Sequence, residues 1–148
     1  MSEPGNTFAR AQMQLGAAYA GAAIENSMLG AAHAAANPLT AHFGIAHGHA
    51  VGLMLPHVVR FNSENKTARE LYESLARAGG LEASVESLAK WLAEALKLTG
   101  LAQSLSGAGV KEESLPMLAE EAARQWTAGF NPRPVTKEDF LQLYTTAC

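Results

Sequence analysis

The chain has 148 residues, 48% of them apolar, a formal net charge of −3 and a single cysteine, Cys148. This length and apolar content suit one domain with its own core and exclude a disordered chain, while one cysteine excludes an internal disulfide framework and favours a reduced, cytoplasmic setting. Because Lys and Arg form no block and no uninterrupted apolar stretch reaches the roughly 18 residues of a membrane span, we expect neither a nucleic acid nor a membrane as partner.

The first third of the chain predicts two helices rich in Ala and Gly. Residues 1–10 lack the basic start and apolar run of a signal peptide, so we expect no leader sequence. A first helix is expected from residue 7 to about Ile24, and its segment over residues 16–24, rich in Ala and Gly, is interpreted as a closely packed core helix. Asn26 or Ser27 can cap a second helix. Pro38 either kinks this helix or ends it, because proline lacks a backbone donor.

The remaining helices follow a turn expected over residues 40–46. A third helix over residues 47–61 is apolar almost all round, so we place it at the centre of the fold, bent at Pro56. Thr136 and Asp139 form a capping box at the start of the last helix. The other expected helices cover residues 64–78, 84–96, 112–127 and 136–147. With no strand signal, repeat or long linker, the fold class is all-α, with about six to eight helices in a single domain over residues 1–148.

Three other side chains in the second half carry structural expectations. Trp91 and Trp126 fall on apolar helical faces and are predicted to lie in the core. Arg133 stands between two prolines in an extended connector, where it is expected to anchor the connector to a carboxylate or a helix end.

The histidines concentrate in one stretch of the chain, residues 31–62. They are His33, His42, His47, His49 and His57. His33 lies on the second helix and His47 at the start of the third, and two helices packed side by side can aim both imidazoles at one point. Neutral imidazole nitrogens bind divalent first-row metals well, but a firm site needs about four donors. No carboxylate lies between Glu25 and Glu64, so spacing alone favours a structural pair over a metal site.

The other three histidines have simpler interpretations. His42 is expected in the connecting turn, as a solvent-facing or cleft-rim residue. His49 points about 200° round the helix from His47, so it is assigned to packing or to the substrate side. His57 is expected to hydrogen-bond a carbonyl that Pro56 leaves free.

Four motifs carry a family resemblance. They read HAAANPL from His33, HG from His47, LPHVVRFN from Leu55, and NPRPVT from Asn131 followed by Glu138-Asp139. In order and spacing these motifs resemble the C-terminal helical domain of the iron-dependent (group III) alcohol dehydrogenases, and the resemblance covers essentially the whole chain. It implies a dehydroquinate synthase-like, all-helical domain.

The resemblance also implies roles for particular residues. His33 and His47 match the two metal-ligand histidines of the family's C-terminal domain, which implies a divalent metal, iron or zinc. Asn37 stands where the family often has a second histidine beside the nicotinamide and the substrate. Asparagine can hydrogen-bond a substrate oxygen but cannot exchange a proton near neutral pH, so we assign Asn37 an orienting role at the catalytic position. Ala46 replaces the family's usual proline before the ligand histidine.

Two features of the family, its other metal ligands and its NAD(P)-binding domain, have no matching residues in this sequence. The family completes its metal site with an upstream aspartate and histidine, and binds NAD(P) in an N-terminal α/β domain with a glycine-rich turn. Too few residues precede His33 to hold either, so we assign no cofactor-binding residue. We therefore expect the metal-binding helical half of an NAD(P)-dependent alcohol dehydrogenase-like oxidoreductase, inactive by itself, with NAD(P) bound only if a partner supplies the missing domain.

Two alternatives stay open on the sequence. The first is a non-catalytic helical module that serves oligomerisation or partner binding. The second is a stand-alone metal binder that takes its missing ligands from His42, water or a symmetry-related chain. We expect either a homo-oligomer or a companion chain that carries the nucleotide-binding domain.

Overall fold

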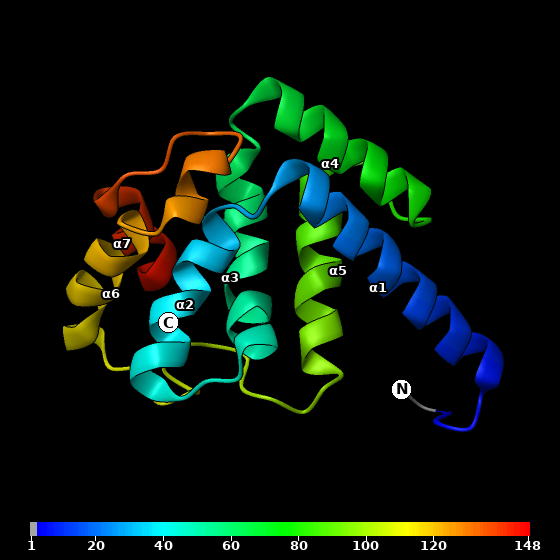
Figure 1. The fold of residues 1–148 in the computed structure, drawn as a ribbon, viewed down its shortest axis with the longest axis horizontal. Helices are drawn as coiled ribbons and strands as arrows, with labels where there is room; N and C mark the ends of the chain where they lie inside the picture. The colour runs from blue at the N-terminus through cyan, green and yellow to red at the C-terminus, as the bar shows by residue number, and fades with distance from the viewer. Residues whose placement is uncertain (1–2) are drawn as a thin grey trace.

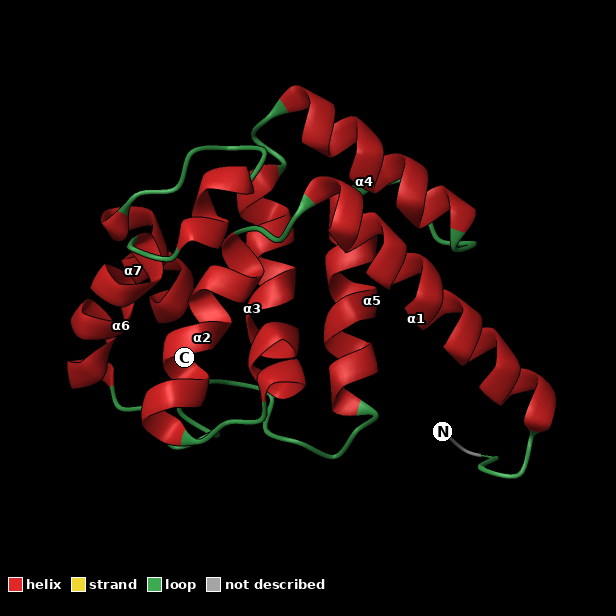
Figure 2. Ribbon diagram, viewed as in Figure 1, coloured by secondary structure: helices red, strands yellow, loops and turns green. Residues whose placement is uncertain are grey.

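Every regular element in residues 3–148, the part of the chain that the computed structural model describes, is helical (Figure 2). The elements are α1 (Thr7–Ser27), α2 (Ala31–Phe43), α3 (His47–Asn62), α4 (Lys66–Ala78), α5 (Val85–Lys97), α6 (Leu115–Ala123) and α7 (Lys137–Ala147), with two short 3₁₀ helices, η1 (Glu112–Ser114) and η2 (Trp126–Phe130). The all-α prediction is confirmed. No helix among these residues is long and apolar enough to cross a bilayer.

The core lies around α2 and α3, which pack side by side (Figure 1). Helix α5 flanks α3 on one side, and α6 and α7 cover α2 and α3 on the other. Four alanines of α2, at positions 31, 34, 35 and 36, are completely buried, and their small side chains let neighbouring backbones approach closely. Helix α3 contacts helices on both of its sides, so its predicted central place is confirmed.

Helix α2 runs through Pro38 and ends later than predicted. It continues to Phe43 and stops at Gly44, whose φ of 64° is the left-handed conformation that glycine adopts readily. The turn predicted over residues 40–46 is therefore shorter. Pro38 is buried, and the Tyr144 hydroxyl of α7 donates to the Ala35 carbonyl in the preceding turn over 2.7 Å. These tertiary contacts favour the helix despite the backbone donor that proline lacks.

The start of α2 also differs from the prediction, because its cap comes from far along the chain. Asn26 and Ser27 belong to the last turn of α1 and donate back to carbonyls one turn earlier. The first N–H of α2, at Ala31, is instead accepted by the side-chain oxygen of Asn131 over 3.2 Å. A cap from a residue 100 positions away leaves no local signal in the sequence.

Helix α1 contradicts the prediction of a packed core helix. None of its 21 residues is buried by the rest of the described chain. Phe8 and Tyr19 are 73% and 68% exposed, and Figure 1 shows α1 extending away from the other helices. The composition of α1 is that of a buried helix, but residues 3–148 contain nothing that covers it.

The two tryptophans are likewise not in the core. Trp91 of α5 is 53% exposed and Trp126 of η2 is 64% exposed. Helix α6 ends at Ala123, so Trp126 follows it in a separate short turn and contacts Phe130 edge to face, with ring centroids 5.7 Å apart. The predicted capping box of α7 is confirmed at Thr136 and Asp139.

Candidate functional site

His33 and His47 lie together, as the sequence predicted for two helices packed side by side. His33 is in the first turn of α2 and half-buried, and His47 is the first residue of α3 and exposed. Their ring centroids are 5.4 Å apart and the ring planes are inclined by 44°. Packing of α2 on α3 therefore holds two imidazoles in one place.

The separation of the two rings can be tested against metal coordination. A metal about 2.1 Å from an imidazole nitrogen lies roughly 3.2 Å from the centroid of that ring, so two rings on one ion have centroids no more than about 6.4 Å apart. The observed 5.4 Å lies within that limit. The separation of the two rings is therefore short enough for both imidazoles to reach a single divalent ion.

The lowered pKa of His33 favours a role as a metal ligand. Burial, and then the neighbouring His47, lower the pKa of the His33 imidazole below its ordinary value. A lowered pKa keeps the ring neutral at physiological pH, and only a neutral imidazole has a free nitrogen lone pair for a metal.

Residues 3–148 place no further His, Cys, Asp or Glu side chain with these two histidines. Within residues 3–148, no group of three or more His, Cys, Asp or Glu side chains is placed to hold a metal. His42 pairs instead with Glu121 of α6 over 2.8 Å, and His49 Nε2 lies 2.8 Å from the Ala102 carbonyl. The described residues thus bring two of these side chains together and no third.

His57 differs from its expectation. Its Nδ1 atom is buried and has no hydrogen-bond partner among residues 3–148, so the predicted bond to a freed carbonyl is absent at that atom. Burial, and then the nearby Arg60, lower the pKa of the His57 ring. His57 lines the hollow between α3 and α7, whereas His33 lines a different one.

Asn37 lies on α2 one helical turn after His33, so the two side chains share a face of the helix. Its amide nitrogen donates to the side-chain oxygen of Gln125 over 3.0 Å, which fixes the orientation of the carboxamide. Gln125 stands between α6 and η2, 88 positions further along. Sequence reasoning missed Gln125, because no motif or spacing marks it.

A hollow of about 390 Å³ opens beside His33. Its walls come from the end of α1, the start of α2, α3, α4 and η2, and include Ile24, Leu55, Tyr72 and Phe130. The walls are mainly apolar, so His33 lies at the edge of a space that favours an apolar occupant.

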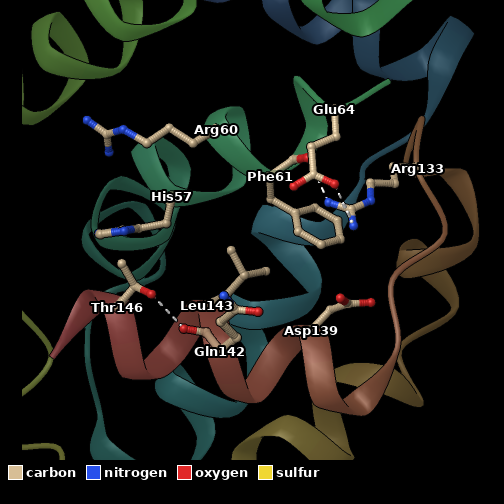
Figure 3. A pocket seen from close by; sticks show the side chains of 9 residues that line it. All are labelled: His57, Arg60, Phe61, Glu64, Arg133, Asp139, Gln142, Leu143 and Thr146. Carbon is tan, nitrogen blue, oxygen red and sulfur yellow. Dashed lines mark hydrogen bonds and ion pairs between the residues drawn. The ribbon is translucent and has the colours of Figure 1, made fainter. Parts of the chain in front are cut away.

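A second hollow, of about 240 Å³, lies between α3 and α7 (Figure 3). The two arginines that line it make structural contacts. Arg133 stacks on the Phe61 ring at 3.8 Å from its centroid, donates to the Phe61 carbonyl over 3.0 Å, and pairs with Glu64 over 3.0 Å (Figure 3). The prediction that Arg133 anchors the connector to a carboxylate and a helix end is confirmed. On the rim, Arg60 is likewise neutralised by Glu86.

Comparison with known proteins places the chain in a family. Residues 1–148 match the model of the Fe-containing alcohol dehydrogenase family, C-terminal. The chain belongs to this family. Lactaldehyde reductase of Escherichia coli strain K12 is 35% identical over 153 residues, which cover 99% of this chain and 40% of that protein. NADPH-dependent butanol dehydrogenase of Clostridium saccharobutylicum is 32% identical, covering 97% of this chain and 39% of that protein.

Solved structures of the family share the fold. An alcohol dehydrogenase from Oenococcus oeni is similar with a TM-score of 0.77 and 29% identity, over 87% of this chain and 35% of that chain. A crystal structure of 1,3-propanediol oxidoreductase gives a TM-score of 0.70 at 29% identity, over 82% of this chain and 33% of that chain. The chain thus spans between 33% and 40% of the length of these four relatives.

Proposed function

We propose that the chain is the metal-binding helical half of an iron-type, NAD(P)-dependent oxidoreductase that interconverts an alcohol and its carbonyl compound. His33 and His47 would hold two positions of a divalent metal. The observation that carries this proposal is the 5.4 Å separation of the two ring centroids on packed helices. Membership of the family supports it.

The residues of the chain have distinct tasks in this proposal. A bound metal supplies Lewis-acid stabilisation of the substrate oxygen. His33 and His47 offer neutral imidazole lone pairs, and α2 and α3 hold them rigidly. Asn37, oriented by its bond to Gln125, offers an amide N–H and a carbonyl oxygen to a substrate hydroxyl. Because an amide exchanges no proton near neutral pH, Asn37 would orient the substrate but not take up its proton.

Metal binding by the purified 148-residue protein tests this proposal. We expect cobalt(II), added anaerobically as a spectroscopic probe, to bind wild type with about 1:1 stoichiometry, and iron(II) or zinc to compete for the site. His33→Ala and His47→Ala should each abolish binding. His42→Ala is the matched control, since it removes an exposed histidine of α2 that pairs with Glu121 instead. Equal cobalt uptake by all four proteins would refute the assignment of His33 and His47.

Turnover provides a second test. We expect no NAD(P)-dependent alcohol oxidation from the 148-residue protein alone, because the donors and the cofactor domain that complete the reaction in the family have no counterpart in residues 3–148. A steady-state assay with NAD and NADP and a series of primary alcohols and diols measures this directly. Sustained turnover that His33→Ala abolishes would show that the chain is a complete enzyme.

The exposed surface of α1 favours one rival function, a helical module for oligomerisation or partner binding. An apolar helix with no buried residue is typical of an interaction surface. Absence of cobalt binding, together with a stable oligomer in solution, would make this rival the better account.

A further inference from the structure

Helix α1 is apolar and uncovered, and it carries only two charged side chains. Arg10 lies near its start and Glu25 near its end. Every residue of α1 is exposed, and within residues 3–148 neither of the two charges takes part in an ion pair. A helix that is apolar on all sides is normally enclosed by other helices. Helix α1 therefore offers both an apolar surface and two unpaired charges to a second molecule.

The two charges lie on one face of α1, with small residues between them. At spacings of three and four residues, which share a helix face, the chain places Arg10, Gln14, Ala17, Gly21, Ile24 and Glu25. Arg10 and Glu25 are about 22 Å apart along the helix axis, with their midpoint between Ala17 and Ala18. A methyl group added at Gly21 would meet no atom within 4 Å, so the described chain leaves this narrow part of the helix open to a neighbour.

This charge pattern is complementary to itself when two copies of α1 run antiparallel. A pair centred between Ala17 and Ala18 brings Arg10 level with Glu25 of the partner subunit, and Glu25 level with Arg10 of the partner subunit. A two-fold axis requires this kind of reciprocal contact. A parallel pair would instead set like charges side by side at both ends, which is unfavourable. The charges of α1 therefore favour a second copy of the same helix as its partner, and they fix the direction.

The place of α1 in the fold leaves room for such a pair. The helix joins the rest of the chain at its C-terminal end, through residues 28–30, and extends away from the other helices (Figure 1). In an antiparallel pair, the two bodies formed by α2–α7 consequently lie at opposite ends of the paired helices. The small residues at the centre let the two backbones approach closely, where no large side chain of this face intervenes.

We propose that two copies of this chain associate through an antiparallel pairing of α1, with Ala17 near the two-fold axis and reciprocal ion pairs between Arg10 and Glu25 at the two ends. This inference goes beyond the proposed function and needs no metal. Its experiments and the cobalt experiment can therefore fail independently of one another.

Sedimentation equilibrium of the 148-residue protein over a wide range of concentrations tests the association. We expect wild type to form dimers as its concentration rises. Arg10→Glu and Glu25→Arg should each raise the dimer dissociation constant by about tenfold or more, because two attractive contacts become repulsive. The double variant restores opposite charges at both ends, so its dissociation constant should return to near that of wild type. Lys111→Glu is the matched control, since it makes the same change of net charge as Arg10→Glu at an exposed position outside α1.

Disulfide cross-linking tests the direction of the pair. In a Cys148→Ser background, Ala17→Cys would lie next to its own copy at the centre. Gln14→Cys lies on the same face but about 10 Å along the axis from its copy, beyond the reach of a disulfide. We therefore expect mild oxidation to give covalent dimers of Ala17→Cys and not of Gln14→Cys. A parallel pair would cross-link at both positions.

Three results would overturn the proposal. The first is a wild-type protein that stays monomeric at every concentration, and the second is a dimer that Arg10→Glu weakens no more than Lys111→Glu does. The third is equal cross-linking at positions 14 and 17. Loss of the fold does not obscure these outcomes, because α1 has no buried residue and its variants should keep the wild-type midpoint of thermal unfolding at concentrations where the protein is monomeric.

Discussion

The side-chain nitrogen of Asn37 donates to the side-chain oxygen of Gln125 over 3.0 Å and links the proposed site to the segment after α6. Gln125 thus positions the carboxamide of Asn37. We expect Gln125→Ala to lower the free energy of unfolding by about 1 kcal/mol, the usual net value of such a bond. Urea unfolding measures this, with Gln103→Ala as control, since Gln103 bonds only a carbonyl two residues away. Equal losses of unfolding free energy in the two variants would mean that the bond to Asn37 stabilises the fold no more than the local bond of Gln103.

Restoring an imidazole at position 37 should strengthen metal binding. Positions 33 and 37 are one helical turn apart, so Asn37→His would present two histidines on one face of α2, near His47. We expect the cobalt dissociation constant to fall by about tenfold or more, since an added donor on a rigid helix needs little reorganisation. Asn37→Ala should leave it unchanged. A variant Asn37→His that binds cobalt no better than wild type would place residue 37 away from the metal position.

Stability should decline on mild acidification because of two histidines. The pKa values of His33 and His57 both lie below the ordinary 6.5 in the folded protein, mainly through burial. The unfolded chain therefore takes up protons at these rings as the pH falls through 6.5 while the folded protein does not, and unfolding becomes more favourable. We expect a fall in unfolding free energy between pH 7.5 and 5 that is shallower in His33→Gln and His57→Gln, and shallowest in the double variant. Urea titrations at several pH values measure it, and equal slopes in all proteins would contradict this origin.

Local signals in the sequence were sufficient for much of the fold. Periodicity predicted the positions of α3, α4, α5 and α7 closely, and the predicted cap of α7 at Thr136 is present. Asn65 and Ser84 likewise cap the helices that directly follow them, and the cap at Asn65 was not predicted. The start of α2 was wrong, because its cap is Asn131, and the burial of α1 was wrong, because composition reports how apolar a helix is but not what covers it.

In the candidate site, too, one contact was predictable from the sequence and another was not. The pairing of His33 with His47 was predictable, since both lie on consecutive helices with a short connection. The contact of Asn37 with Gln125 was not, since it depends on how α6 packs against α2 and on the turn that follows α6. The roles of these residues in metal binding and catalysis stay predictions for the experiments above.

The hydroxyl of Tyr144 should contribute measurably to the core. It is buried and donates to the Ala35 carbonyl over 2.7 Å, tying α7 to the middle of α2. Removing only this hydroxyl in Tyr144→Phe should cost about 1 to 2 kcal/mol of unfolding free energy, the range for a buried neutral hydrogen bond. Tyr19→Phe is the matched control, because Tyr19 is exposed on α1. A cost no greater than that of the control would show that the bond is not formed in solution.

Asn131 should couple the stability of the fold to the proposed metal site at His33. Its side chain accepts from the first N–H of α2, exchanges hydrogen bonds with the buried Asn62, and donates to the Arg133 carbonyl. Asn131→Ala removes a helix cap and leaves the Asn62 amide without these partners, so we expect a loss of about 2 to 4 kcal/mol. His33 lies in the turn that this cap fixes, so cobalt affinity should fall as well. The control is Asn65→Ala, which removes the cap of α4, away from His33. It should lower stability by about 1 kcal/mol and leave cobalt affinity unchanged. If both variants weaken cobalt binding equally, the effect reflects general destabilisation and not the position of α2.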